Sequence, residues 1–268
     1  MTMLSLELGP PEEAEAFRAR LARGEAVVGC FLSLGSSLTA EVMAAAGYDW
    51  ALIDLEHGAG DERDALAQIQ ALAIRRCLTL VRVESTVRQR VHRVLDYGAH
   101  GVMFPRIETP EEAQAAVAAM RYPPAGVRGV ALSNRATAYG ARSRSYVEGS
   151  TALLTVVQIE STRAVENCEA IAEVEGVDAL FIGPADLSHS MGRLGSFDDP
   201  DFVAALGRTA QAAASHGKWS GILLPNPADV RKYFHLGFRL IAAGSDAALL
   251  SNAAGALVKS LRHELAQP

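Results

Sequence analysis

The chain has 268 residues, of which 49% are hydrophobic and 21% are charged, and its formal net charge at pH 7 is −6. This length suits one domain with a large core, and the composition is that of an ordinary globular protein. The charge is mild and scattered, so we expect no basic face for nucleic acid, and no apolar run is long enough to span a membrane.

The first predicted element is an N-terminal helix within residues 1–24. Pro10 and Pro11 precede three glutamates, and three arginines follow, an order that matches the helix dipole. The segment lacks the cationic start and apolar run of a secretion signal. The cysteines have no metal-binding spacing, so we expect buried free thiols in a cytoplasmic protein at Cys30, Cys77 and Cys168.

After Gly24, short apolar runs alternate with segments of helical period. The runs cover residues 27–33, 50–54, 78–83, 101–105, 152–160, 179–183, 219–224 and 238–244. Helical segments cover residues 61–74, 110–120, 162–173, 201–216 and 226–236. Because the runs are continuously apolar, we expect strands that are buried on both faces of a parallel sheet.

Eight such strands alternating with helices predict an α/β fold, a (β/α)8 TIM barrel with an added N-terminal helix. A doubly wound open sheet is the alternative, but the first strand is followed by Gly35 and by no G-x-G-x-x-G turn. We expect residues 1–268 to form one domain, with the C-terminal helix 245–268 a candidate for packing on a neighbouring subunit. The long connection 121–150 should hold a short helix near Tyr139 and cover or extend the binding site.

Charged and polar side chains follow several of the predicted strands. Barrel enzymes place their chemistry at the carboxyl ends of the strands, so these residues should share one rim. Two of the acids, Glu160 and Asp186, would share one small space with His57 and Arg82, which is favourable only around a bound ion. The residues concerned are Asp54, His57, Arg82, Gln158, Glu160 and Asp186.

Each of these residues also has a plainer interpretation. Arg82 could pair with Glu84, and His57 could be an ordinary loop histidine. Glu160 could be the acid in the first turn of the following helix, and Asp186 could be an N-cap. The shared rim is what favours function over these alternatives.

Glu160 and Asp186 supply hard oxygen ligands from neighbouring strands, which suits Mg²⁺ or Mn²⁺ carrying a chelating substrate. No His or Cys cluster indicates structural zinc. No lysine ends a predicted strand, which argues against Schiff-base chemistry; the lysines are Lys218, Lys232 and Lys259.

The stretches "AAGYDWALIDLEHG", "LDYGAHGVMFPRIET", "YPPAGVRG", "VVQIES" and "VDALFIGPADLSHSMG" resemble the HpcH/HpaI aldolase/citrate lyase family, and within it the class II pyruvate aldolases. The resemblance runs from about Val28 to Leu250. It implies a metal-dependent (β/α)8 barrel that assembles as a homohexamer, a trimer of dimers. It also implies an activity like that of 4-hydroxy-2-oxoheptanedioate or 2-keto-3-deoxy-sugar-acid aldolases.

The same resemblance implies roles for individual residues. Glu160 and Asp186 look like the metal ligands, His57 like the proton-transfer group, and Arg82 like the stabiliser of the developing oxyanion. Asp54 would lie behind His57. The keto acid would be held by Gln158 and the backbone around Ala185, with Gly183, Pro184, Asp186 and Leu223 completing the substrate site.

Asp96 matches an acid that raises the basicity of the catalytic histidine in the family. Its alternative is a local pair with His92 or Arg93, at helical spacing. The resemblance leaves the aldehyde open, because the stretches "GAGDERD" and "ALSNRATAYG" that should choose it are variable.

The implied function is a class II aldolase, a carbon–carbon lyase that cleaves or forms 4-hydroxy-2-oxo acids through a metal-stabilised enolate. The cofactor would be Mg²⁺ or Mn²⁺, with Co²⁺ a further candidate, and the partners a 2-keto acid and an aldehyde. One alternative is an acyl-CoA ester lyase, for which Arg135, Arg142 and Arg144 form the one basic cluster. Another is a non-catalytic keto-acid binding protein.

Overall fold

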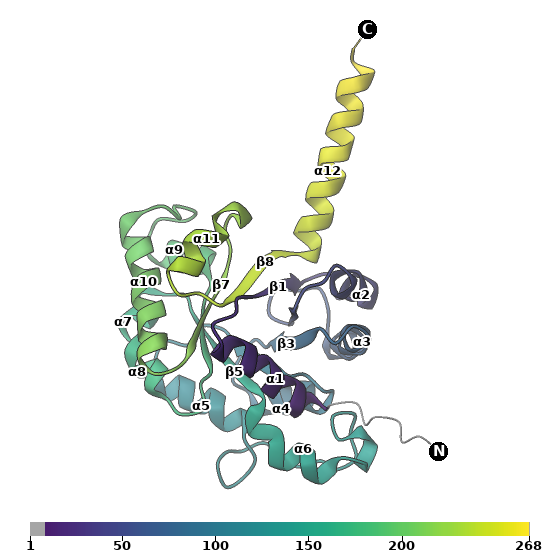
Figure 1. Ribbon diagram of the computed structural model, residues 1–268, viewed down its shortest axis with the longest axis vertical. Helices are drawn as coiled ribbons and strands as arrows, with labels where there is room; N and C mark the ends of the chain where they lie inside the picture. Colours follow the sequence, from purple (N-terminus) through teal and green to yellow (C-terminus); the bar gives the residue numbers. More distant parts are fainter. Residues whose placement is uncertain (1–8, 268) are drawn as a thin grey trace.

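The computed structural model describes residues 9–267, and its centre is a closed barrel of parallel strands in sequence order, β1 to β8 (Figure 1). The strands are β1 Val27–Leu32, β2 Trp50–Asp54, β3 Leu78–Arg82, β4 Gly101–Phe104, β5 Leu154–Ile159, β6 Ala179–Ile182, β7 Trp219–Leu223 and β8 Leu240–Ser245. Each overlaps one predicted run, so the predicted (β/α)8 barrel is confirmed.

Helices follow the strands, and all but the last of them lie around the barrel (Figure 1). They are α1 Pro10–Ala22, α2 Ser37–Ala45, α3 Glu62–Ala73, α4 Arg88–Asp96, α5 Pro110–Met120, α6 Ser143–Gly149, α7 Thr162–Glu166, α8 Cys168–Glu173, α9 Pro184–Ser190, α10 Pro200–Ser215, α11 Val230–His235 and α12 Asp246–Leu265. Short 3-10 turns are η1 Ala138–Gly140, η2 Ser150–Ala152 and η3 Pro227–Asp229. The short helix expected near Tyr139 is therefore confirmed.

One predicted helix is divided. Residues 162–173 form α7 and α8, because Asn167 leaves the helical conformation at φ −96° and ψ 3°. Its side-chain amide donates instead to the carbonyl oxygen of Glu108, 2.7 Å away. A side chain that bonds to the backbone outside its own helix competes with the helical ladder.

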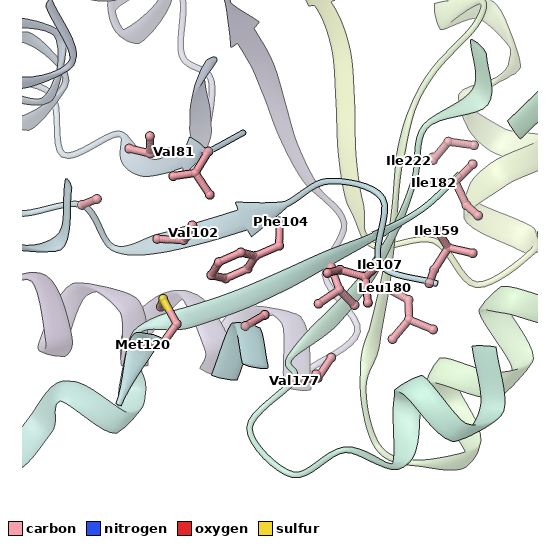
Figure 2. Packing of buried hydrophobic residues seen from close by; sticks show 14 of the residues in the cluster. Val81, Val102, Phe104, Ile107, Met120, Ile159, Val177, Leu180, Ile182 and Ile222 are labelled. Carbon is pink, nitrogen blue, oxygen red and sulfur yellow. The ribbon is translucent and has the colours of Figure 1, made fainter. Parts of the chain in front are cut away.

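Alternation of side chains along each strand separates two layers of packing. Outward-facing residues pack between the sheet and the helices, as Val102, Phe104 and Ile182 do in Figure 2. Inward-facing residues fill the barrel, with Trp50 and Phe181 the largest among them. Glycines on the neighbouring strands make room for these rings: a Cβ at Gly29 would lie 2.2 Å from Trp50, and one at Gly221 would lie 2.4 Å from Phe181.

The helix α1 closes the amino end of the barrel. Phe17 and Leu21 pack into the inward-facing cluster, and the Nη2 of Arg18 lies 2.8 Å from the Oδ2 of Asp178, just before β6. The predicted N-terminal helix is confirmed from Pro10 onward, and residues 1–8 of the predicted span lie outside the described residues.

The last helix, α12, projects away from the barrel (Figure 1). Among its 20 residues only Asp246 is buried, and Leu250, Leu257 and Leu261 are exposed. Within residues 9–267, no helix combines the length and the apolar character that crossing a bilayer requires.

Candidate active site

Every second residue of a strand faces into the barrel, and at the carboxyl end of several strands this inward-facing residue is polar. Trp50 and Leu52 face inward from β2, and Asp54 continues the same series as the strand ends. On β3, Leu80 faces inward and Arg82 follows it. The sequence therefore places Asp54 and Arg82 side by side, as the register of the two strands confirms.

Strands β5 and β6 contribute in the same way. Val156 faces inward, and Gln158 and Glu160 continue its series past the end of β5. On β6 the series from Phe181 reaches Gly183, where a Cβ would lie 2.5 Å from the Oε2 of Glu160. Only glycine leaves room for the carboxylate at this position.

Arg82 is the centre of a buried network, with 7% of its surface exposed. Its Nε and Nη2 donate to the two carboxylate oxygens of Asp54, at 3.0 and 2.7 Å. Its Nη1 lies 3.1 Å from the Oε2 of Glu56 and donates to the Oε1 of Gln158 at 3.3 Å. This geometry holds the guanidinium in one orientation, because the fork to Asp54 fixes its plane.

Charge pairing controls the protonation of this network. Burial alone would raise the pKa of the Asp54 carboxyl, but the hydrogen bonds and charge of Arg82 outweigh it and hold that pKa below its ordinary value. Burial likewise raises the pKa of Glu56, even though the charge of Arg82 opposes this. The alternative partner for Arg82 is wrong, because Glu84 pairs with Arg90 at 2.7 Å.

Glu160 is buried near two other carboxylates, those of Asp186 and Glu56. Burial raises the pKa of its carboxyl to about 7, and the negative charges of Asp186 and Glu56 act in the same direction. Its Oε1 accepts the backbone N–H of Arg106 at 2.7 Å. The alternative role as a first-turn acid is wrong, because Ser161 caps α7 and Glu160 precedes the helix.

These carboxylates fit a divalent cation. Burial, with the nearby charges of Asp186 and Glu56, disfavours the charged form of Glu160, and a cation bound beside it would favour that form. Carboxylate oxygens are the ligands that Mg²⁺ and Mn²⁺ prefer. The absence of a side chain at Gly183 makes room for the Oε2 of Glu160, which a Cβ there would approach to 2.5 Å. Within residues 9–267, no three His, Cys, Asp or Glu side chains form a ready metal cluster, and a two-carboxylate site leaves positions for substrate.

Asp186 is the third residue of α9, so its alternative role as an N-cap is wrong; Gly183 holds that position. Pro184 begins the helix and is buried, whereas Ala185 and Asp186 are exposed at the rim. Leu223 ends β7, partly buried against the inward-facing cluster. The structure thus brings these residues to the same end of the barrel as Glu160.

His57 has 68% of its side chain exposed, and its Nε2 lies 3.8 Å from the Oε2 of Glu56. The Oδ1 of Asp54 accepts the backbone N–H groups of Glu56 and His57, at 3.1 and 3.2 Å. Asp54 therefore holds both Arg82 and the turn that carries His57. Glu56 was not among the predicted site residues, although it continues the inward-facing series of Asp54 by one more step of two residues.

Asp96 does not join this group within one chain. It ends α4, and the helix of a (β/α)8 barrel runs back to the amino end of the next strand. Its Oδ1 accepts from the Nη2 of Arg128 at 2.9 Å, and Arg128 is buried between the rings of Tyr122 and Tyr146. A catalytic role for Asp96 would therefore act on another subunit. The alternative ion pair between Asp96 and Arg93 is not formed, because Arg93 pairs with Glu62 instead.

A (β/α)8 barrel with a cluster of carboxylates at the carboxyl ends of its strands defines the class of protein, an enzyme with its site on the catalytic rim. The sequence profile of the HpcH/HpaI aldolase/citrate lyase family matches residues 27–253, and the chain belongs to that family.

Individual relatives agree with this assignment. The chain is 38% identical over 246 residues to a 5-keto-4-deoxy-D-glucarate aldolase of Escherichia coli, covering 92% of this chain and 96% of that protein. A crystal structure of a family protein from Burkholderia cenocepacia is 40% identical, with a TM-score of 0.87 over 92% of this chain and 99% of that one. An aldolase structure from Desulfitobacterium hafniense is 28% identical, with a TM-score of 0.86 over 94% and 97% of the two chains.

The chain is accordingly a carbon–carbon lyase of the metal-dependent aldolase type, and the prediction of a divalent metal cofactor is confirmed at that level. The acyl-CoA lyase and the non-catalytic binding protein are not favoured by these relatives.

Proposed function

We propose that the protein cleaves and forms 4-hydroxy-2-oxo acids through the enolate of pyruvate or a related 2-keto acid, with Mg²⁺ or Mn²⁺ as cofactor and Co²⁺ as a further candidate. The observation that carries the proposal is the buried Glu160, whose pKa is raised to about 7 beside Asp186 and Glu56. A folded protein keeps such an unfavourable cluster where a bound cation compensates for it.

In this proposal Glu160 and Asp186 hold the metal, which when bound acts as a Lewis acid on the keto group of the substrate. Gln158 and the backbone of Gly183, Pro184 and Ala185 hold the carboxylate of the keto acid. Leu223 provides an apolar wall beside it.

The remaining roles concern charge and proton movement. Arg82 faces the oxyanion that develops on the keto oxygen, and the fork to Asp54 keeps it in place without reorganisation during the reaction. His57, exposed on the turn that Asp54 organises, removes or returns the proton. Asp96 would assist the His57 of a neighbouring subunit.

The relative from Escherichia coli is named for 5-keto-4-deoxy-D-glucarate. We propose a substrate of this chemical class for the present chain, a six-carbon 2-keto-3-deoxy sugar acid with a carboxylate at each end. In such an acid C2 is the keto carbon and C3 is its α-carbon. Cleavage of the bond between C3 and C4 yields pyruvate and a three-carbon aldehyde that carries a carboxylate.

Pyruvate methyl-proton exchange in heavy water, followed by NMR, tests the proposal without the correct aldehyde. The protein is stripped of metal with a chelator, measured, and measured again after Mg²⁺ or Mn²⁺ is restored. We expect exchange only with metal, and loss of exchange in Glu160→Gln. Exchange that persists after chelation would overturn the metal assignment, and no exchange in either state would overturn pyruvate as the donor.

The three arginines that could have bound the phosphates of a CoA ester form hydrogen bonds or ion pairs with other residues of the chain. The Nη1 of Arg135 donates to the carbonyl of Tyr97 at 2.7 Å, and the Nε of Arg144 donates to Glu148 at 2.7 Å. Arg142 pairs with Glu12 on α1. They therefore do not form a phosphate-binding cluster on the catalytic rim, in agreement with the relatives.

We further propose that residues 1–268 form one domain and that α12 packs on a second copy of the chain. The eighth helix of a (β/α)8 barrel belongs between the helices that follow β1 and β7. Here that place, between α2 and α11, has exposed apolar side chains: Leu38 and Val42 on α2, and Val230 and Phe234 on α11. Leu250, Leu257 and Leu261 form a matching exposed stripe at helical spacing on α12.

If each of two chains packs its α12 into this place on the other chain, the two form a dimer by reciprocal exchange of α12. Three such dimers would build the proposed trimer of dimers. Multi-angle light scattering of Leu257→Asp against Asn252→Asp tests this, because both introduce one negative charge on α12 and only the first lies on the stripe. We expect L257D to reduce the mass of the assembly and N252D to leave it unchanged. An L257D protein with the mass of the parent would contradict the exchange.

A further inference from the structure

Arg106 combines a strained backbone with a direct bond to the candidate metal ligand. It follows β4 with φ +51°, in the left-handed region that residues other than glycine rarely adopt. In this conformation its N–H donates to the Oε1 of Glu160 at 2.7 Å. Strain of this kind persists where the surrounding structure requires it, and here the strained residue donates its N–H to Glu160.

The side chain of Arg106 differs from other arginines that follow barrel strands. Arg163 and Arg193 form ion pairs with Glu108 and Asp199. Arg106 is exposed and has no ion pair or side-chain hydrogen bond among residues 9–267. The backbone of Arg106 therefore lies against the candidate metal ligand, and its exposed guanidinium forms no ion pair within the described part of the chain.

The chemistry of the proposed substrate requires such a group. A keto sugar diacid carries a second carboxylate on its aldehyde half, away from the keto acid that Gln158 and the β6 backbone would hold. Arg82 is assigned to the keto end of the substrate, where Asp54 and Gln158 fix its orientation, so the second carboxylate needs another partner. A planar guanidinium is the side chain that best matches a carboxylate.

We propose that Arg106 binds the carboxylate of the aldehyde half and so selects acidic over neutral acceptors. This assignment rests on the proposed aldolase function and deepens it by naming the group that recognises the acceptor. The left-handed backbone fixes the start of the side chain against Glu160, so selection of the acceptor is tied to the position of the metal ligand.

The test compares two aldehydes of equal carbon number, tartronate semialdehyde and glyceraldehyde, in pyruvate aldol addition by the metal-loaded enzyme. The readout is the ratio of their kcat/KM values, which cancels any effect of a substitution on enolate formation. In Arg106→Ala we expect the ratio to fall about 10- to 100-fold, the range of a hydrogen bond between charged groups. Arg106→Lys should recover part of it, because the charge remains.

Arg76 supplies a matched control, since it is an exposed arginine with φ +54° at the amino end of β3. Arg76→Ala has the same chemical change in the same backbone conformation and should leave the ratio unchanged. An unaltered ratio in R106A, or an equal loss with both aldehydes, would overturn the acceptor role. Failure of the unsubstituted enzyme to exchange pyruvate protons would instead overturn the aldolase function on which the role rests.

Discussion

The two ends of the barrel both bury charged groups, and they treat them differently. At the amino end two buried groups are paired with an opposite charge: the Nε2 of His100 lies 2.6 Å from Glu13, and Arg18 lies 2.8 Å from Asp178. At the carboxyl end burial raises the pKa of Glu160, and the charges of two further carboxylates, Asp186 and Glu56, act in the same direction.

The charged groups at the amino end therefore belong to the scaffold, and those at the carboxyl end belong to the candidate site. Buried ion pairs with complete partners contribute to one fixed structure, whereas an excess of one charge in a buried place requires a ligand. Substitutions at the amino end should therefore change stability, and matched substitutions at the carboxyl end should change activity.

The two histidines give the sharpest contrast. His57→Ala should reduce pyruvate proton exchange by about 10²- to 10⁴-fold, the usual contribution of a general acid–base group. Its stability should stay within about 0.5 kcal/mol of the parent, because the side chain is 68% exposed. His100→Ala should lower the free energy of unfolding in urea by about 1–3 kcal/mol and leave proton exchange unchanged. The substitution leaves the backbone N–H of Thr79 and the carboxylate of Glu13 without their partner. Full exchange in H57A would refute the proton-transfer role.

The two arginines come next. In Arg82→Lys the fork to Asp54 is lost, so we expect kcat/KM for the retro-aldol reaction to fall about 10²- to 10³-fold. Arg18→Lys disturbs the pair with Asp178 at the amino end, and kcat/KM should not change. Steady-state kinetics of both variants check this, and an R82K enzyme with most of the parent rate would exclude Arg82 as the oxyanion stabiliser.

The smallest effect concerns the pH dependence of stability in metal-free protein. The pKa of Glu160 is about 7 in the folded chain against an ordinary 4.5, so between these values the folded state binds more protons than the unfolded state. Stability should therefore fall as pH rises through this window, by up to about 1.4 kcal/mol per pH unit, and level off above it.

Urea unfolding of Glu160→Gln from pH 4.5 to 8 measures this contribution, because the variant lacks the titrating group. We expect E160Q to be more stable than the parent at pH 8 without metal. Asp178→Asn, which loses the ion pair with Arg18, should be less stable than the parent at that pH. A parallel pH profile in E160Q and the parent would show that Glu160 titrates normally.

Much of the site was predictable from local pattern. Continuous apolar runs predicted every strand, and the residues that end them predicted Asp54, Arg82, Gln158 and Glu160 at one rim. The reason is that strand periodicity and the position of strand ends are properties of short segments. The division of the helix at Asn167 was not predictable, because it depends on a bond to Glu108 in a different part of the chain.

Local pattern was thus enough to predict the order of strands and helices, the parallel barrel and the acids and arginine at its carboxyl end. The folded chain was needed to show that Asp54 and Glu56 are the partners of Arg82, that Arg106 bonds to Glu160, and that Asp96 lies at the other end. It was also needed to show that α12 leaves the barrel. Periodicity is read within one segment, but these contacts join segments that meet only when the barrel closes.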